Sequence, residues 1–221
     1  MGAYEAVAIE SDGRRLAGLL FGTDAGAGEP TRPGVLFIHG YGSDQRGYRS
    51  RAEAVVGAIG AVCLTFDLGG HGESSGTRAS LTPLDHRRDA LAAYDRLVAL
   101  PGVDPNRIGV CGASYGAYLA AELVSERPVS RLLLRAPTLV GDAGGRPPVG
   151  ITTFRGRVLV VESGEDEVIP RSTIAAYLEA CGGRARHEVI EGATHALTDP
   201  RWQQAFVDLI VDWFSDLWRV A

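Results

Sequence analysis

The hydrophobic positions of this chain form short apolar runs that alternate with longer segments of helical periodicity. Uninterrupted apolar runs of this length are typical of strands buried on both faces of a sheet. GVLFIHG and AVCLTFD are such runs, and NRIGVCG, VSRLLLRAP, RGRVLVVESG and ARHEVIEG also predict strands. The segments between and after them that predict helices are 47–59, 84–100, 115–126, 172–180 and 202–217. Strands and helices in alternation predict a mostly parallel sheet with helices on both faces.

The two ends of the chain complete this prediction. The N-terminal segment YEAVAIESDGRRLAGLLF indicates two strands joined at Asp12-Gly13, a dipeptide that favours the positive φ angles of a hairpin turn. Near the C-terminus, apolar residues at spacings of three and four indicate a helix facing the core: Trp202, Phe206, Leu209, Ile210, Trp213, Phe214 and Leu217. We therefore expect an α/β fold of about eight strands with an antiparallel hairpin at one edge.

Composition narrows the range of partners. The chain has 221 residues, 45% of them hydrophobic, which is typical of one globular domain over residues 1–221. Its net charge of −5 gives no support for nucleic acid or a membrane as a partner. All 22 basic residues are arginine, which excludes a phosphate-binding loop with lysine and a lysine Schiff base.

Cysteine usage and the N-terminus bear on location. Cys63, Cys111 and Cys181 show no C-x-x-C spacing, which favours buried free thiols in a reducing compartment. The first residues lack the basic start and apolar segment of a secretory signal, and no segment reaches the length of a membrane helix. We expect a cytoplasmic protein.

One strand-end loop carries a serine between glycines. The segment Gly112-Ala113-Ser114-Tyr115-Gly116 fits the pattern G-x-S-x-G between a strand and a helix. Such a strained turn lifts the serine hydroxyl clear of the sheet, and its glycines permit close approach of neighbouring backbone. The alternative is an ordinary strand-to-helix turn that contains a serine.

Two later strand ends carry acids and a histidine. In SGEDEVIP, Asp166 could orient a histidine; Glu165 and Glu167 compete with it, and a solvated acidic turn is the alternative. In EGATHALTD, His195 precedes the final helix. Because ligands meet the carboxyl ends of strands in such sheets, these groups and Ser114 belong to one edge.

The loop FIHGYGSDQRG, at the end of another strand, completes a candidate site. A His-Gly dipeptide at such a strand end commonly precedes a backbone N–H that stabilises the negative oxygen of an acyl-transfer intermediate, and each such donor contributes a few kcal/mol. The N–H of Tyr41 and that of Tyr115 are the candidates. His39 is then expected to support the loop, not to act as a base.

Together these segments resemble one known superfamily. HGYGSD, DLGGHGESSG, GASYG, GEDEVIP and GATH correspond, in order, to landmarks of the α/β-hydrolases, and the resemblance runs through nearly the whole chain. It is strongest to small lidless serine esterases and to the dienelactone-hydrolase-like or acyl-peptidase-like branch. The resemblance implies Ser114 as nucleophile, Asp166 in preference to its neighbours as the orienting acid, and His195 as the base.

The chain departs from these relatives in two places. Dienelactone hydrolases carry cysteine where this chain has Ser114. Many relatives also insert several helices between Arg135 and Arg157, where this chain has only a short irregular segment. We therefore expect no cap domain, and a flap-like connection over residues 138–156.

The expected activity is cleavage of carboxylic esters through an acyl-enzyme, with thioesters and amides open to the same groups. Perhydrolase, C–C hydrolase, peptidase and non-catalytic ligand-binding members of the fold are the alternatives. We expect a small-molecule substrate, no cofactor and no metal, since no metal-binding motif is present and GGHGESSG does not fit a dinucleotide loop. An open site is also compatible with a homodimer.

Four residues are candidates for substrate contact: His39, Arg46, Tyr118 and Arg135. Arg46 lies in the loop after His39, and Arg135 follows a buried strand. Either arginine could attract an acidic substrate, and the alternative for both is a surface ion pair.

Overall fold

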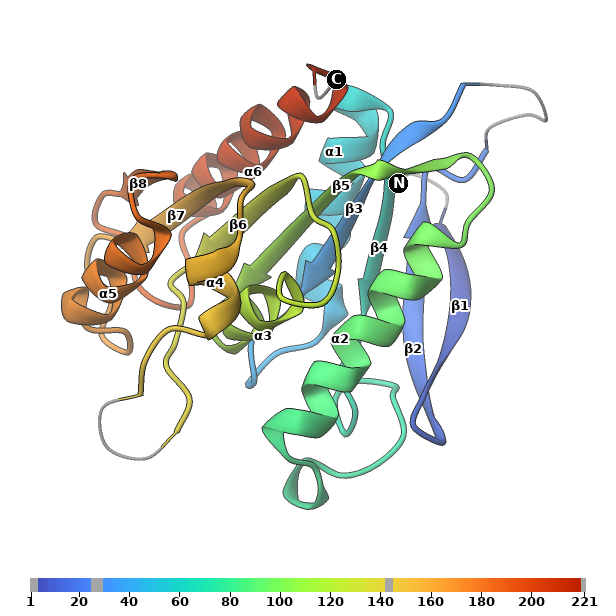
Figure 1. Ribbon diagram of the computed structural model, residues 1–221, viewed down its shortest axis with the longest axis horizontal. Coiled ribbons are helices and arrows are strands. Elements are labelled where there is room, and N and C mark those ends of the chain that lie inside the picture. The colour runs from blue at the N-terminus through green and yellow to red at the C-terminus, as the bar shows by residue number, and fades with distance from the viewer. Residues whose placement is uncertain (1–3, 25–29, 142–144, 220–221) are drawn as a thin grey trace.

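An eight-stranded sheet organises the molecule (Figure 1). The computed structural model describes residues 4–24, 30–141 and 145–219. The strand order is β1-β2-β4-β3-β5-β6-β7-β8; β2 pairs antiparallel with β1 and β4, and the remaining pairs are parallel. The strands are β1 (Tyr4–Ser11), β2 (Arg14–Phe21), β3 (Arg32–Ile38), β4 (Val62–Phe66), β5 (Val103–Ala113), β6 (Arg131–Arg135), β7 (Arg157–Ser163) and β8 (Ala185–Ile190). The predicted fold is confirmed.

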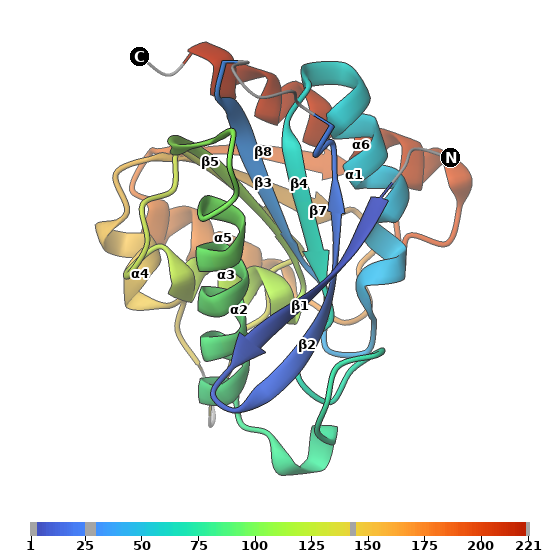
Figure 2. The ribbon, with the colours of Figure 1, turned by 90° about the vertical axis from the view of Figure 1, so that its right-hand side faces the viewer.

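Helices cover both faces of the sheet. They are η1 (Gln45–Tyr48), α1 (Arg49–Ile59), η2 (Arg78–Ser80), α2 (Pro83–Val98), α3 (Tyr115–Leu123), α4 (Val149–Thr153), α5 (Arg171–Cys181), α6 (Pro200–Ser215) and η3 (Asp216–Arg219). Helices α1 and α6 pack on one face, and α2, α3 and α5 pack on the other (Figures 1 and 2).

The core has two layers because successive strand residues point to opposite faces. In β3, Leu36 and Ile38 pack with α2 and α3, whereas Val35 and Phe37 pack with α1 and α6. The apolar stripe of the last helix faces this second layer, with Phe206, Ile210, Trp213, Phe214 and Leu217 buried. The prediction that this stripe is core-facing is confirmed.

Local chemistry explains the predicted turns and ends. Asp12 and Gly13 both have positive φ, 51° and 77°, as the hairpin between β1 and β2 requires. Helix α2 begins with a capping box, in which Thr82 and Asp85 bond each other's backbone N–H. The three cysteines are free and buried, as expected. Within the described ranges, no helix is long and apolar enough to cross a membrane.

The connection between β6 and β7 contains an element that the sequence did not predict. Helix α4 forms within the segment expected to be irregular. No cap domain is evident in the described part of this connection, in agreement with the prediction. Residues 142–144 of this connection lie outside the described part of the chain, and its role as a flap stays a prediction.

Candidate active site

Ser114 lies on a strained turn between β5 and α3. Its φ is 53° and its ψ is −118°, a conformation that is costly for a residue with a side chain. The glycines on either side are required by close contacts: a Cβ on Gly112 would clash with the backbone of Gly116, and a Cβ on Gly116 would clash with the carbonyls of Ile38 and His39. The turn therefore has the geometry that the G-x-S-x-G pattern predicts.

A hydrogen-bond chain links the three residues that the sequence singled out. His195 Nε2 lies 3.1 Å from Ser114 Oγ, and His195 Nδ1 lies 2.9 Å from Asp166 Oδ2. The serine follows β5, the acid follows β7 and the histidine follows β8. The structure thus brings together three side chains from loops far apart in the sequence.

The ionisation of Asp166 determines where the proton of the His195 imidazole lies. Partial burial raises the pKa of its carboxyl, but hydrogen bonds from the N–H of Ile169, from His195 and from the N–H of Val168 outweigh burial and lower the pKa. An ionised carboxylate only accepts hydrogen bonds, so the proton of a neutral imidazole lies on Nδ1. His195 Nε2 is then free to accept the proton of Ser114.

The two competing acids occupy different positions. Glu167 accepts a hydrogen bond of 3.1 Å from the backbone N–H of His195, so it contacts the histidine loop without reaching the imidazole. Glu165 is exposed. Of the three acids, Asp166 is the one that bonds the imidazole.

The two predicted oxyanion donors are free. Within the described ranges, the backbone N–H groups of Tyr41 and Tyr115 have no acceptor. Gly40 lies against the serine, since a Cβ built on it would be 3.4 Å from Ser114 Cβ. His71 Nε2 lies 2.7 Å from the carbonyl of Tyr41, within hydrogen-bonding distance of the same loop. The arrangement can therefore offer two N–H donors beside the serine.

His39 is in a supporting position. It is fully buried; Nδ1–H donates to the carbonyl of Gly40 at 2.8 Å, and Nε2 accepts from the N–H of Leu68 at 3.0 Å. Burial lowers its pKa to about 4. Both ring nitrogens are occupied by backbone, so the ring has none free for a substrate.

A second buried histidine, which sequence reasoning left without a role in the site, anchors Tyr115. His86 on α2 lies with Nδ1 at 3.0 Å from the Tyr115 hydroxyl and Nε2 at 3.1 Å from the carbonyl of Gly69. Burial lowers the pKa of His86 and raises that of Tyr115. The neutral pair fixes the residue whose N–H is a candidate oxyanion donor.

A cleft of about 630 Å³ opens beside Ser114 and His195. Arg46 and Arg135 both line it. Arg46 is exposed and paired with Asp44, which fits the surface ion pair considered for it. Arg135 is buried and donates to the carbonyl of His195 and to Ser163 Oγ, so it does not form the surface ion pair considered for it.

Tyr118, another candidate for substrate contact, is half-buried and stacks on Tyr115; it is not among the residues that line the cleft.

The cleft also contains a residue that the sequence did not indicate. Arg51, on α1, lines it near Tyr48 and Phe206. Candidate site residues are recognisable in the sequence where they follow strands, whereas Arg51 lies in the first turn of a helix. Among the described residues, no group of three or more His, Cys, Asp or Glu side chains is placed to hold a metal ion.

Comparison with known proteins identifies the family. A family model described as serine aminopeptidase, S33, matches residues 29–151, which is more than half of the chain. The chain belongs to this family of α/β-hydrolases. An uncharacterised protein of Mycobacterium tuberculosis is 31% identical to this hydrolase over 208 residues, which cover 86% of this chain and 71% of that protein.

Solved structures share the fold of the hydrolase at low sequence identity. Est1E from Butyrivibrio proteoclasticus, solved with ferulic acid bound, superposes with a TM-score of 0.81 at 18% identity and covers 97% of this chain and 100% of its own. Dienelactone hydrolase from Anabaena variabilis superposes with a TM-score of 0.76 at 22% identity, covering 96% and 97%. At these identities the likeness concerns the fold.

Proposed function

We propose that this α/β-hydrolase cleaves carboxylic esters by acyl transfer to Ser114. The observation that carries the proposal is the hydrogen-bond chain from Ser114 through His195 to Asp166, beside two free backbone N–H groups. A nucleophile, a general base with a fixed tautomer and a site for negative charge are the groups that acyl transfer needs.

The mechanism follows from these positions. His195 Nε2 takes the proton of Ser114 Oγ as the oxygen attacks the ester carbonyl carbon. The N–H groups of Tyr41 and Tyr115 hold the resulting negative oxygen, and each donor contributes about 3 kcal/mol of transition-state stabilisation. His195 then protonates the leaving alcohol, which gives the acyl-enzyme. Water, deprotonated by His195, attacks the acyl carbon and releases the acid and free Ser114.

The described cleft argues against aminopeptidase activity, which the family description suggests. An aminopeptidase has to bind the positive amino terminus of a peptide, and a carboxylate side chain is the natural partner for that charge. The cleft's lining, as far as the chain is described, includes Arg46, Arg51 and Arg135 and no aspartate or glutamate. A neutral or acidic substrate suits this lining better, and thioesters remain within reach of the same groups.

Replacing the nucleophile tests the proposal. We expect Ser114→Ala to abolish hydrolysis of 4-nitrophenyl acetate and labelling by a fluorophosphonate, because both require an activated serine. Ser125→Ala is the matched control, since Ser125 is exposed and bonds only the carbonyl of Glu122. Retained turnover in Ser114→Ala would refute the mechanism; a folded wild-type protein that neither reacts nor hydrolyses esters would indicate a ligand-binding member.

A further inference from the structure

Two arginines in the catalytic cleft have no carboxylate partner. Arg51 comes from α1 and Arg135 from the end of β6, and both guanidinium groups lie over the ring of Phe206, at 5.3 and 6.0 Å from its centroid. Within the described ranges, neither forms an ion pair, and the Nε–H of each is buried without an acceptor. Two cations thus share one wall of the cleft.

Arg135 is partly used by the protein. It is 6% exposed, and one terminal nitrogen donates to Ser163 Oγ at 3.1 Å and to the carbonyl of His195. Burial lowers the pKa of its guanidinium, and the like charge of Arg51 acts in the same direction, while the charge of Asp166 opposes it. Its remaining hydrogen-bonding capacity is unused.

Arg51 is the more available of the two. It is half-buried, its guanidinium lies 5.2 Å from the Tyr48 ring centroid, and it donates to the carbonyl of Gly47 in the preceding turn. The rings of Tyr48 and Phe206 both lie against the guanidinium and restrict its movement. A fixed, planar cation with open donors is suited to bidentate binding of a carboxylate.

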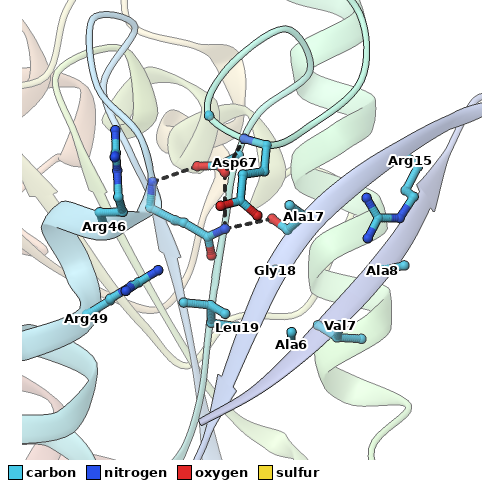
Figure 3. A pocket seen from close by; sticks show the side chains of 13 residues that line it. Ala6, Val7, Ala8, Arg15, Ala17, Gly18, Leu19, Arg46, Arg49 and Asp67 are labelled. Carbon is cyan, nitrogen blue, oxygen red and sulfur yellow. Dashed lines mark hydrogen bonds between the residues drawn. The ribbon is translucent and has the colours of Figure 1, made fainter. Parts of the chain in front are cut away.

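A neighbouring pocket differs from the catalytic cleft in its balance of charged side chains. That pocket, of about 230 Å³, lies between β1, β2 and η1, and Figure 3 shows Arg15, Arg46 and Arg49 around it. It contains its own acids: Asp67, which bonds the backbone and side chain of Gln45, and Glu73. Among the described residues that line the catalytic cleft, none is an acid.

We propose that the cleft binds an ester that carries a free carboxylate, with the carboxylate held by Arg51 in the field of Arg135. This inference rests on the proposed ester hydrolysis and names its substrate class. The cleft runs from Ser114 and His195 to Arg51, so one arm of the substrate lies between the reacting carbonyl and the guanidinium. The carboxylate offsets the repulsion between the two cations and accepts hydrogen bonds from the unused terminal N–H groups of Arg51.

Matched pairs of esters test this inference. Monomethyl adipate against methyl hexanoate places the carboxylate in the acyl half, and 4-acetoxybutanoate against butyl acetate places it in the alcohol half. We expect at least one charged ester to exceed its neutral match in kcat/KM by about tenfold or more, because hydrogen bonds to charged groups contribute about 1.5–3 kcal/mol.

Substitutions of two arginines on α1 test whether Arg51 causes the preference for the charged ester. Arg51→Gln should remove most of the preference for the charged ester, mainly through KM, and Arg51→Lys should restore part of it. Arg49→Gln is the matched control: it removes the same charge from the same helix, but Arg49 stacks on Tyr4 and lies outside the cleft, so the preference should persist. The inference would be overturned if the wild type showed no preference for a charged ester, or if Arg51→Gln kept that preference. Either result would leave the proposed ester hydrolysis intact.

A binding measurement separates failure of the inference from failure of the proposed activity. Calorimetry with Ser114→Ala should detect binding of monomethyl adipate, and the Ser114→Ala/Arg51→Gln double variant should bind it about tenfold more weakly or worse. If no ester is hydrolysed but this binding is found, the proposed activity is wrong and the carboxylate site stands. If the charged ester is hydrolysed but both variants bind it equally, the carboxylate site is wrong.

Discussion

Asp166 determines which nitrogen of His195 faces the serine. Its lowered pKa keeps the carboxyl ionised at neutral pH, and the ionised form accepts from Nδ1. A carboxyl whose folded-state pKa lies below its ordinary value stabilises the fold fully above that ordinary value. This contribution is lost as the pH falls through the lowered pKa, so acid conditions weaken both the fold and the orientation of the imidazole.

Asp166→Asn should therefore lower kcat strongly while the protein stays folded. The amide can donate to Nδ1, which favours the tautomer with its proton on Nε2, and a loss of about 10⁴-fold is expected for such a change. Steady-state kinetics, with circular dichroism to verify folding, measure it. Glu165→Gln, an exposed neighbour, is the control and should keep near-normal kcat; the reverse order of effects would contradict the assignment of the acid.

Among single residues of the candidate site, the sequence indicates those that follow a strand and does not indicate those that lie elsewhere. Ser114, Asp166 and His195 could be found because each follows an apolar run in the order typical of the superfamily. Arg51 and His86 sit within helices, where a polar residue is usually solvated, and only the tertiary structure shows which partner each one meets.

The strand-to-helix turn is the element on which the site depends. Gly116 lies in the first turn of α3 against the carbonyls at the end of β3, and this contact holds the serine turn against the loop that contains Tyr41. The helix also directs its free N–H groups toward the serine, where developing negative charge benefits from them.

Gly116→Ala should destabilise the fold and impair catalysis. Its Cβ would meet two backbone carbonyls that cannot move aside cheaply, and overpacking of this kind costs about 1–3 kcal/mol. Gly57→Ala is the matched control, since Gly57 is exposed on α1 with nothing within 4 Å of a built Cβ, and it should stabilise the helix by up to about 1 kcal/mol. Urea unfolding measures both; equal stability changes would contradict the packing described for the turn.

Helices and strands were predictable from the sequence where a clear hydrophobic pattern marked them. Strands such as β3 and β4 are buried on both faces, so their apolar runs are distinct in the sequence. Helix α4 was not predictable, because five residues are too few to show a helical period and Val149–Thr153 is rich in β-branched residues. Its Gly150 lies against the carbonyl of Ala121 in α3, so tertiary contact favours it over local preference.

On the scale of the whole molecule, the sheet gathers loops from four strand ends at one edge. That arrangement was predictable from the alternation of elements, because carboxyl ends of parallel strands meet at one side. The substrate was not predictable, since this fold hosts many reactions and the chemistry of its cleft depends on residues from separate strands, helices and loops. Burial of Arg135 under the histidine loop is an example, because nothing local to β6 indicates it.

The most direct test of the central claim is a search for the acyl-enzyme itself. The protein is mixed with a 4-nitrophenyl ester, quenched in acid within the first turnover and digested for mass spectrometry. The account predicts that the acyl mass is found on the peptide containing Ser114 and that Ser114→Ala lacks it. Ester turnover with no acyl group on Ser114, or with the acyl group on another residue, would contradict it.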